Sequence, residues 1–156
     1  MRNSMRNANG IALANGCAVL LQFVLLLQVT LAEEDKLRDY TRIAVVPFVE
    51  LTGSPERAGW GDAVAELTYL RLSRVKGLVA LKPVDAIVQL KSMGKTVKDC
   101  TIRNTALTLG RRCNADWVVN GTLGNGGGDI DVLVMGVEVA TGKEQTVQSA
   151  RVSEDT

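Results

Sequence analysis

This chain of 156 residues contains parts of known phosphate-binding motifs, but none of the motifs is complete. Residues 121–129, GTLGNGGGD, are dense in glycine, but a phosphate-binding loop needs its glycines between a strand and a helix N-terminus. Here the glycines join two strand-like segments, so we expect a hairpin turn. Lys95 is followed by Thr96 as in a Walker A motif, yet Gln89 stands where the upstream glycine belongs. The sequence therefore predicts no phosphate loop.

Catalytic and metal-binding side chains are also incomplete. The chain has no histidine, which excludes a histidine general base, a histidine-assisted nucleophile and any histidine-containing metal site. Ser54 and Ser73 consequently lack such a base, and no spacing typical of a Ser-Lys pair is present. Asp129 and Asp131 could share one sheet face, but further ligands are missing, so we expect a solvated hairpin end. The sequence predicts a non-enzymatic protein without catalytic residues, cofactor or metal.

Two of the three cysteines, Cys100 and Cys113, follow the N-terminal segment, and they do not form a CxxC motif. The segment between them predicts one continuous helix, with Ile102, Ala106, Leu109 and Cys113 on a single stripe. Such a helix separates the two sulfur atoms by about 20 Å, whereas a disulfide requires Cα atoms within about 7 Å. We therefore expect no bond between them, with Cys113 buried and Cys100 loosely placed.

The first 32 residues have the layout of a secretory signal. Arg2 and Arg6 precede the apolar run of residues 17–32, and the charged residues EEDK follow, so we expect Ala32 to be the last residue removed. The alternative is an uncleaved inner-membrane anchor facing the periplasm, since residues 11–32 are long enough to span a bilayer. Both alternatives predict a periplasmic location, with a membrane tether only if this segment is retained.

The charge balance argues against a nucleic-acid partner. The whole chain carries +1, and residues 33–156 carry 16 basic and 17 acidic side chains. Nucleic-acid binding requires a clustered basic face. The overall composition gives no reason to expect one.

A linker over residues 33–41 is expected to lead into one domain, residues 42–156. Residues 42–48 predict a strand buried on both faces that ends near Pro47, and residues 49–59 predict a loop. The next segment, residues 60–75, predicts a helix with one apolar face and Gly77 as its C-cap. The members of that apolar face are Trp60, Ala63, Val64, Leu67 and Leu70.

The second half predicts a further strand at 78–82 and a helix that begins at Pro83, because proline is favoured at the first helical position. Val84, Ile87 and Leu90 are expected to form the buried face of that helix. Three more strands follow, at 115–123, 130–139 and 146–152, joined by hairpin turns. The order is β-α-β-α-α-β-β-β, an α/β (α+β) fold with a mixed sheet of about five strands and helices packed on it.

Four segments in this order resemble the TolB N-terminal-like domain family. RIAVVPFVELTGSPE resembles the start of such domains, and LSRVKGLVAL, LGRRCNADWVVNGTL and VEVATGKE resemble later parts. The resemblance extends from Arg42 to Gln145. It implies structural roles, and no catalytic role, for Pro47, Phe48, Gly77, Asp116, Gly121, Thr141 and Gly142.

The wider fold group includes the curli secretion component CsgG and the LpoB-type periplasmic domains, which implies envelope assembly through protein contacts. The chain is too short for the propeller of TolB and lacks the membrane hairpins of CsgG. We expect a bacterial envelope protein that binds another envelope protein through loop 49–59 or the edge strand 146–152, and the sequence leaves both a monomer and an oligomer open. A small-ligand or nucleotide-binding regulatory module that uses the glycine turn, and a subunit of a secretion-type assembly, are alternatives.

Overall fold

The computed structural model of the protein describes residues 40–51, 53, 58–125 and 129–153. The predicted signal segment, residues 1–32, and the linker as far as residue 39 lie outside the described residues. So do Ser54 and the centre of the glycine turn, residues 126–128.

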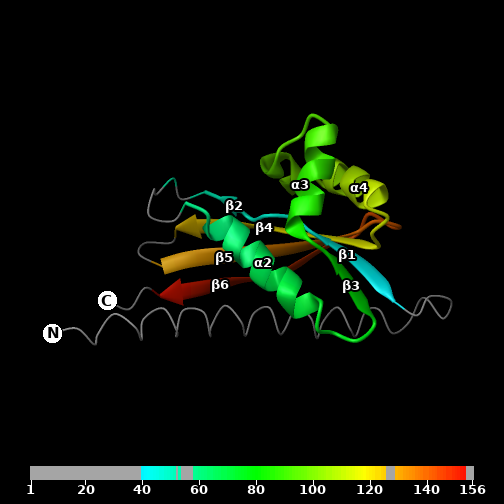
Figure 1. The fold of residues 1–156 in the computed structure, drawn as a ribbon. Coiled ribbons are helices and arrows are strands. Elements are labelled where there is room, and N and C mark those ends of the chain that lie inside the picture. Colours follow the sequence, from blue (N-terminus) through cyan, green and yellow to red (C-terminus); the bar gives the residue numbers. More distant parts are fainter. Residues whose placement is uncertain (1–39, 52, 54–57, 126–128, 154–156) are drawn as a thin grey trace.

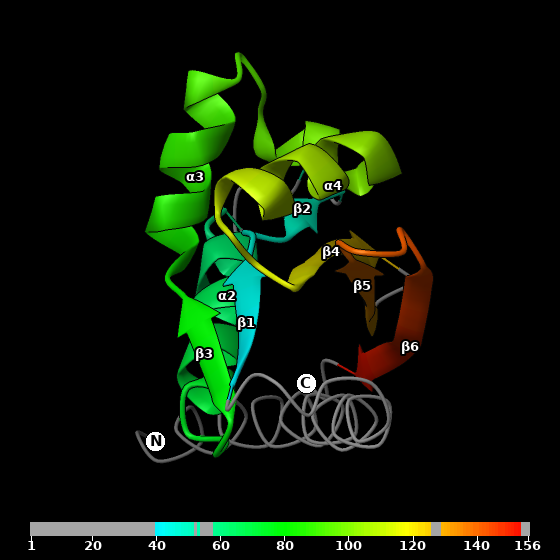
Figure 2. The ribbon, with the colours of Figure 1, turned by 90° about the vertical axis from the view of Figure 1, so that its right-hand side faces the viewer.

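One mixed six-stranded sheet organises the described residues (Figure 1). Its order is β3 (Leu78–Leu81), β1 (Thr41–Val45), β4 (Trp117–Asn125), β5 (Asp129–Glu138) and β6 (Glu144–Ser153). The first three strands run parallel, and β5 and β6 follow as antiparallel hairpins. Figure 2 shows β3 and β6 at the two ends of the sheet. The predicted α/β class and mixed sheet are confirmed, and so are both hairpins.

The segment expected as loop 49–59 begins with a short strand that its sequence did not predict. β2 (Val49–Glu50) pairs with β4 in parallel, so β1 and β2 act as one strand interrupted around Pro47. Proline has no N–H to donate to a ladder, which explains why the first strand stops before it. The Phe48 N–H donates to the Gly61 carbonyl, and pairing with β4 resumes at Val49, so the sheet has six strands where about five were expected.

The face of α2 (Trp60–Leu72) that packs on the sheet differs from the predicted one. Its buried residues are Gly61, Ala65, Thr68 and Leu72. Trp60 and Leu70, expected in the core, are 39% and 44% exposed. The reason is a close approach, because a Cβ at Gly61 would overlap the carbonyl oxygen of Phe48. Only small side chains fit on this side of the helix near its N-terminus, whereas Leu72 at its C-terminal end is fully buried.

The end of α2 also differs from expectation. The helix stops at Leu72, with Ser73 as its C-cap, and does not reach Gly77. Gly77 has a φ of +83°, which glycine adopts without steric cost, in the turn before β3. Its carbonyl accepts a hydrogen bond from the Thr41 N–H at 2.7 Å. Gly77 is therefore a turn residue that positions β3 beside β1, and not a helix cap.

Helices α3 (Pro83–Ser92) and α4 (Arg103–Arg112) cover the opposite face of the sheet (Figure 1). Pro83 is the first residue of α3, as predicted. Small residues again face the sheet, since Ala86 is fully buried beside Leu90 whereas Val84 is 56% exposed. The expected face of α3 was therefore right for Leu90 and wrong for Val84.

The segment between the two cysteines is not one helix. Residues Val97–Thr101 form a short 3-10 helix, η2, and α4 begins after Ile102, whose φ of −90° and ψ of 120° are extended. Cys100 is buried, contrary to expectation, and Ile102 is 56% exposed. The break redirects the chain, so both cysteines belong to one apolar cluster with α3 and α4. Both thiols are free, as expected. The reason given for it was wrong, because no continuous helix separates the two cysteines.

Two separate hydrophobic clusters result from alternation along the strands. Ile43 and Val45 of β1 point toward α2, where they join Trp117, Val119 and others. Ala44 lies on the other side with Val118 of β4, against α3 and α4. Strand β1 is thus buried on both faces, as its continuous apolar sequence predicts.

Candidate interaction surface

Among the described residues, strand β6 forms one end of the sheet and pairs only with β5. It has ten residues, whereas β3 at the other end has four and runs directly into α3. The register changes between Val134 and Met135 of β5, where the pairing skips Val147. Such a bulge increases the local twist of an edge strand.

The hydrogen bonds of the β5–β6 hairpin indicate which backbone groups of β6 are free. The Glu138 N–H donates to the Lys143 carbonyl at 2.9 Å, so the even-numbered residues of β5 direct their backbone groups toward β6. Val132 pairs with Ala150 on this ladder. Because directions alternate along a strand, Ser149 and Arg151 direct their N–H groups away from the sheet. These groups can accept an additional strand.

The other predicted contact region, loop 49–59, is partly committed to holding α2 in place. The Glu50 carboxylate accepts a hydrogen bond from the Gly61 N–H at 2.8 Å, and the Phe48 N–H donates to the Gly61 carbonyl at 3.2 Å. A carboxylate at this helix N-terminus also interacts favourably with the helix dipole. Leu51 is 64% exposed and is the described apolar side chain of this loop that could contact a partner.

The family-derived positions have structural roles. The Asp116 carboxylate accepts a hydrogen bond from the Arg42 N–H at 2.8 Å, and its backbone N–H donates to the Arg42 carbonyl. The Asp116 carbonyl accepts a hydrogen bond from the Val139 N–H at 2.8 Å, so Asp116 joins β1, β4 and the end of β5. Gly142 has a φ of +69° in the second hairpin turn.

The described residues include no arrangement that indicates acid-base catalysis or metal binding. No three acidic or thiol side chains among them converge on a metal-sized site. Asp131 lies half-buried on β5, and the side chain of its predicted companion, Asp129, lies outside the described residues. Burial, with smaller contributions from the neighbouring Asp99 and Cys113, raises the pKa of Cys100 to about 12. The pKa of Cys113 is raised as well, chiefly by burial, so both groups remain thiols at neutral pH.

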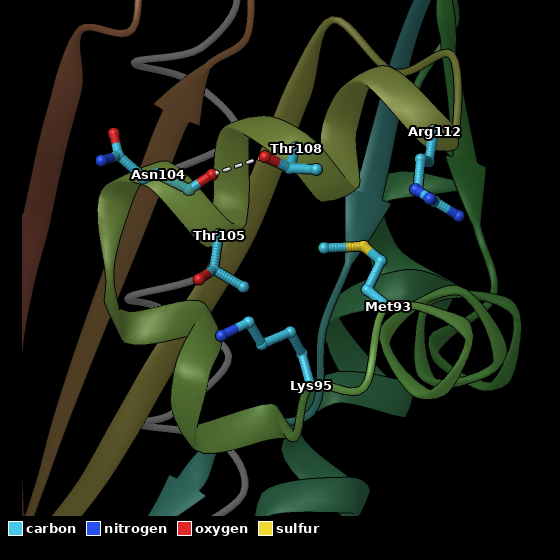
Figure 3. A pocket seen from close by; sticks show the side chains of 6 residues that line it. All are labelled: Met93, Lys95, Asn104, Thr105, Thr108 and Arg112. Atoms are coloured by element: carbon cyan, nitrogen blue, oxygen red, sulfur yellow. Dashed lines mark hydrogen bonds between the residues drawn. The ribbon is translucent and has the colours of Figure 1, made fainter.

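A pocket that the sequence did not predict lies between the end of α3 and α4 (Figure 3). We call it the α4 pocket. It is open to solvent and has a volume of about 440 Å³. Its lining residues are Met93, Lys95, Asn104, Thr105, Thr108 and Arg112. A local count of charges would have indicated the region, because residues 86–115 contain six basic side chains and one acidic side chain.

The comparisons with known proteins show a fold and no family. The sequence matches no protein-family model and no curated protein. The C-terminal domain of LpoB from Salmonella enterica matches with a TM-score of 0.52 at 12% identity, over 79% of this chain and 88% of that domain. Lipoprotein GNA1162 from Neisseria meningitidis matches with a TM-score of 0.56 at 21% identity, over 72% of this chain and 80% of that one.

The NMR structure of E. coli LpoB gives a TM-score of 0.60 at 14% identity, over 76% of this chain and 59% of that one. Identities this low establish a shared fold. The predicted relationship to LpoB-type domains is confirmed at that level, and the TolB-specific assignment stays a prediction. Within the described residues, no helix is both long and apolar enough to cross a bilayer.

Proposed function

We propose that this chain is an exported, non-enzymatic module of the bacterial cell envelope that binds another envelope protein through the free edge of β6. The observation that carries the proposal is this ten-residue edge strand, in a fold shared with the LpoB C-terminal domain and a neisserial lipoprotein. The signal-like segment, residues 1–32, supports export. Four segments resemble TolB N-terminal-like domains in the same order, and this resemblance supports a location in the cell envelope.

The proposed mode of binding is strand addition. The outward backbone groups of Ser149 and Arg151 form hydrogen bonds with the backbone of the partner. Any extended segment that aligns with the β6 edge can make these bonds. Side chains of the partner would then determine specificity by alternating between the two faces of the sheet. Such a mode requires neither a cofactor nor a deep cleft.

Proline substitutions test the mode, since proline removes one N–H. We expect Ser149→Pro and Arg151→Pro to reduce capture of the partner from envelope extracts at least fivefold while the melting temperature stays nearly unchanged. Ala150→Pro is the matched comparison, because its N–H faces β5 and its loss should lower the melting temperature. Equal capture by wild type and both outward variants would contradict the edge model.

Crosslinking in intact cells identifies the partner. A photoactivatable residue at position 151 should yield one predominant crosslinked protein, identified by mass spectrometry. The same residue at position 79, on the opposite edge strand β3, serves as control and should not capture that protein. Crosslinks from position 79 alone would place the partner on the wrong edge and contradict the proposal.

A further inference from the structure

The lining of the α4 pocket consists of hydrogen-bond donors and one apolar side chain, with no carboxylate. Lys95 and Arg112 carry positive charge, Asn104 provides an amide, and Thr105 and Thr108 provide hydroxyl groups. A group with several acceptor oxygens and a negative charge matches such a lining. We propose that the α4 pocket binds the phosphate group of a ligand, independently of the β6 edge.

Thr105 gives the pocket a polar group that lacks a partner within the protein. The residue is 8% exposed, and its hydroxyl makes no hydrogen bond to another described residue. Because the residue lines the pocket and its oxygen is not among the enclosed polar atoms that lack a partner, the hydroxyl is open to the pocket, where it can bond to water or to a ligand. The neighbouring Thr108 hydroxyl, by contrast, donates to the Asn104 carbonyl at 2.9 Å. An oxygen of a bound phosphate would satisfy Thr105.

The charge of the surrounding segment favours an anion. The six basic side chains of residues 86–115 are Lys91, Lys95, Lys98, Arg103, Arg111 and Arg112. Asp99 is the single acid of that segment, whereas the rest of the chain has 12 basic and 16 acidic residues. The near-neutral total therefore conceals a basic helical layer, which we define as α3, η2 and α4 (residues 83–112), with six basic side chains and two acids, Asp85 and Asp99. Such a layer raises the local concentration of anions.

The one acid of residues 86–115 is engaged elsewhere. The Asp99 carboxylate accepts hydrogen bonds from the Thr96 N–H at 2.7 Å and from the Thr96 hydroxyl at 2.9 Å. These bonds form a capping box at the start of η2. Asp99 lies near enough to Lys95 to offset part of its charge, but it does not line the pocket.

The N-terminus of α4 contributes to the same end of the pocket. No side chain caps this helix, which has ten residues, so the partial positive charge of its first turn is not neutralised there. Asn104 and Thr105 belong to that first turn and also line the pocket. The helix dipole and the Lys95 ammonium therefore favour the same charge on a ligand.

The arrangement in Figure 3 suggests where the phosphate lies. The Lys95 side chain extends toward Thr105, whereas Arg112 is at the other end of the pocket, beyond Met93. Arg112 is held by a hydrogen bond of 3.3 Å from its guanidinium to the Ser92 hydroxyl. The phosphate fits between Lys95 and Thr105, and the remainder of the ligand passes over Met93 toward Arg112.

Amide chemical-shift titrations of the full chain test the proposal. The probes are inorganic phosphate and glycerol 3-phosphate at constant ionic strength, with chloride as reference. We expect saturable shifts in residues 95–112. The apparent Kd should rise at least tenfold in Lys95→Ala and in Thr105→Val, which keeps the shape of the side chain. Lys98→Ala removes a nearby exposed charge outside the pocket and should raise the Kd less than about twofold, because it alters only the general field and no contact.

Sedimentation with phosphatidylglycerol vesicles separates two sources of phosphate. Co-sedimentation that falls in Lys95→Ala but not in Lys98→Ala identifies a lipid headgroup. Saturable binding of the soluble probes without that difference identifies a free phosphate compound. Shifts that do not saturate with any probe, or equal weakening by Lys95→Ala and Lys98→Ala, overturn the proposal. Lys95 is exposed, so its variant retains the fold and decides the question even if Thr105→Val does not fold.

Discussion

The side-chain amide of Asn120, in the middle of β4, donates a hydrogen bond of 2.7 Å to the backbone carbonyl of Cys100 in η2. Both residues are buried. The bond joins the sheet to the 3-10 helix that leads into α4 and the α4 pocket. Asn120-Gly121-Thr122 matches the pattern of a glycosylation sequon, but an amide engaged in the core cannot accept a glycan in the folded protein.

Asn120→Ala should lower the free energy of unfolding by about 1–3 kcal/mol, because it leaves the buried Cys100 carbonyl without its partner. Urea denaturation measures the change. Asn104→Ala, at an exposed position of α4, is the control and should change stability by less than about 0.5 kcal/mol. Equal effects of the two substitutions would show that the Asn120 bond contributes little.

The two thiols should differ in their rate of alkylation at pH 8. Cys100 is 1% exposed with its pKa raised to about 12, whereas Cys113 is only half-buried. In a Cys17→Ser background, iodoacetamide should modify Cys113 at least tenfold faster than Cys100, as followed by peptide mass spectrometry. In denaturant the two rates should become similar. Equal rates in the native protein would mean that η2 opens readily.

Stability should decrease in alkaline solution. The folded-state pKa of Cys100, about 12, lies above its ordinary value of 9.0, so the folded state favours the thiol. The resulting stabilisation is complete below pH 9 and is lost as the pH rises toward 12. Urea denaturation of wild type and Cys100→Ala at pH 8 and pH 10.5 measures it. The wild type should lose more stability between these values than the variant, and parallel losses would contradict the assignment.

Gly121→Ala should destabilise the protein by about 3 kcal/mol. A methyl group there would lie 2.6 Å from the ring of Phe48 and would also overlap the Leu133 carbonyl oxygen. Gly124→Ala, three residues along the same strand, is a matched control, because its nearest neighbour would be the Asp131 Cβ at 3.8 Å. Melting temperatures of both variants give the comparison, and similar values would refute the packing argument.

The sequence predicted the strands well and the buried helix faces poorly, for one physical reason. A strand such as β1, buried on both sides, needs only an apolar run, and a run can be read directly. The side of α2 that faces the sheet is instead determined by how closely the helix approaches, and Gly61 and Ala65 permit contact that Trp60 and Leu70 do not. Large apolar residues therefore pointed to the wrong side.

The candidate sites show the same division. The free edge of β6 could be predicted because it depends on the order of strands, and its outward N–H groups follow from alternation. The α4 pocket could not, since it depends on the break at Ile102 that places Lys95 and Thr105 beside the same opening. The segment otherwise has the composition of one long helix, and the summed charge of the whole chain conceals its local excess.

The sheet separates two hydrophobic cores, one beneath α2 and one beneath α3 and α4. Its two apolar clusters have no member in common, and they are filled from alternate residues of the same strands. A change of volume beneath α2 therefore has little means of reaching α3 and α4, and substitutions in the two halves should be energetically additive. The basic helical layer is accordingly free to diverge or to be exchanged by engineering while the opposite half and the edge strand keep their geometry.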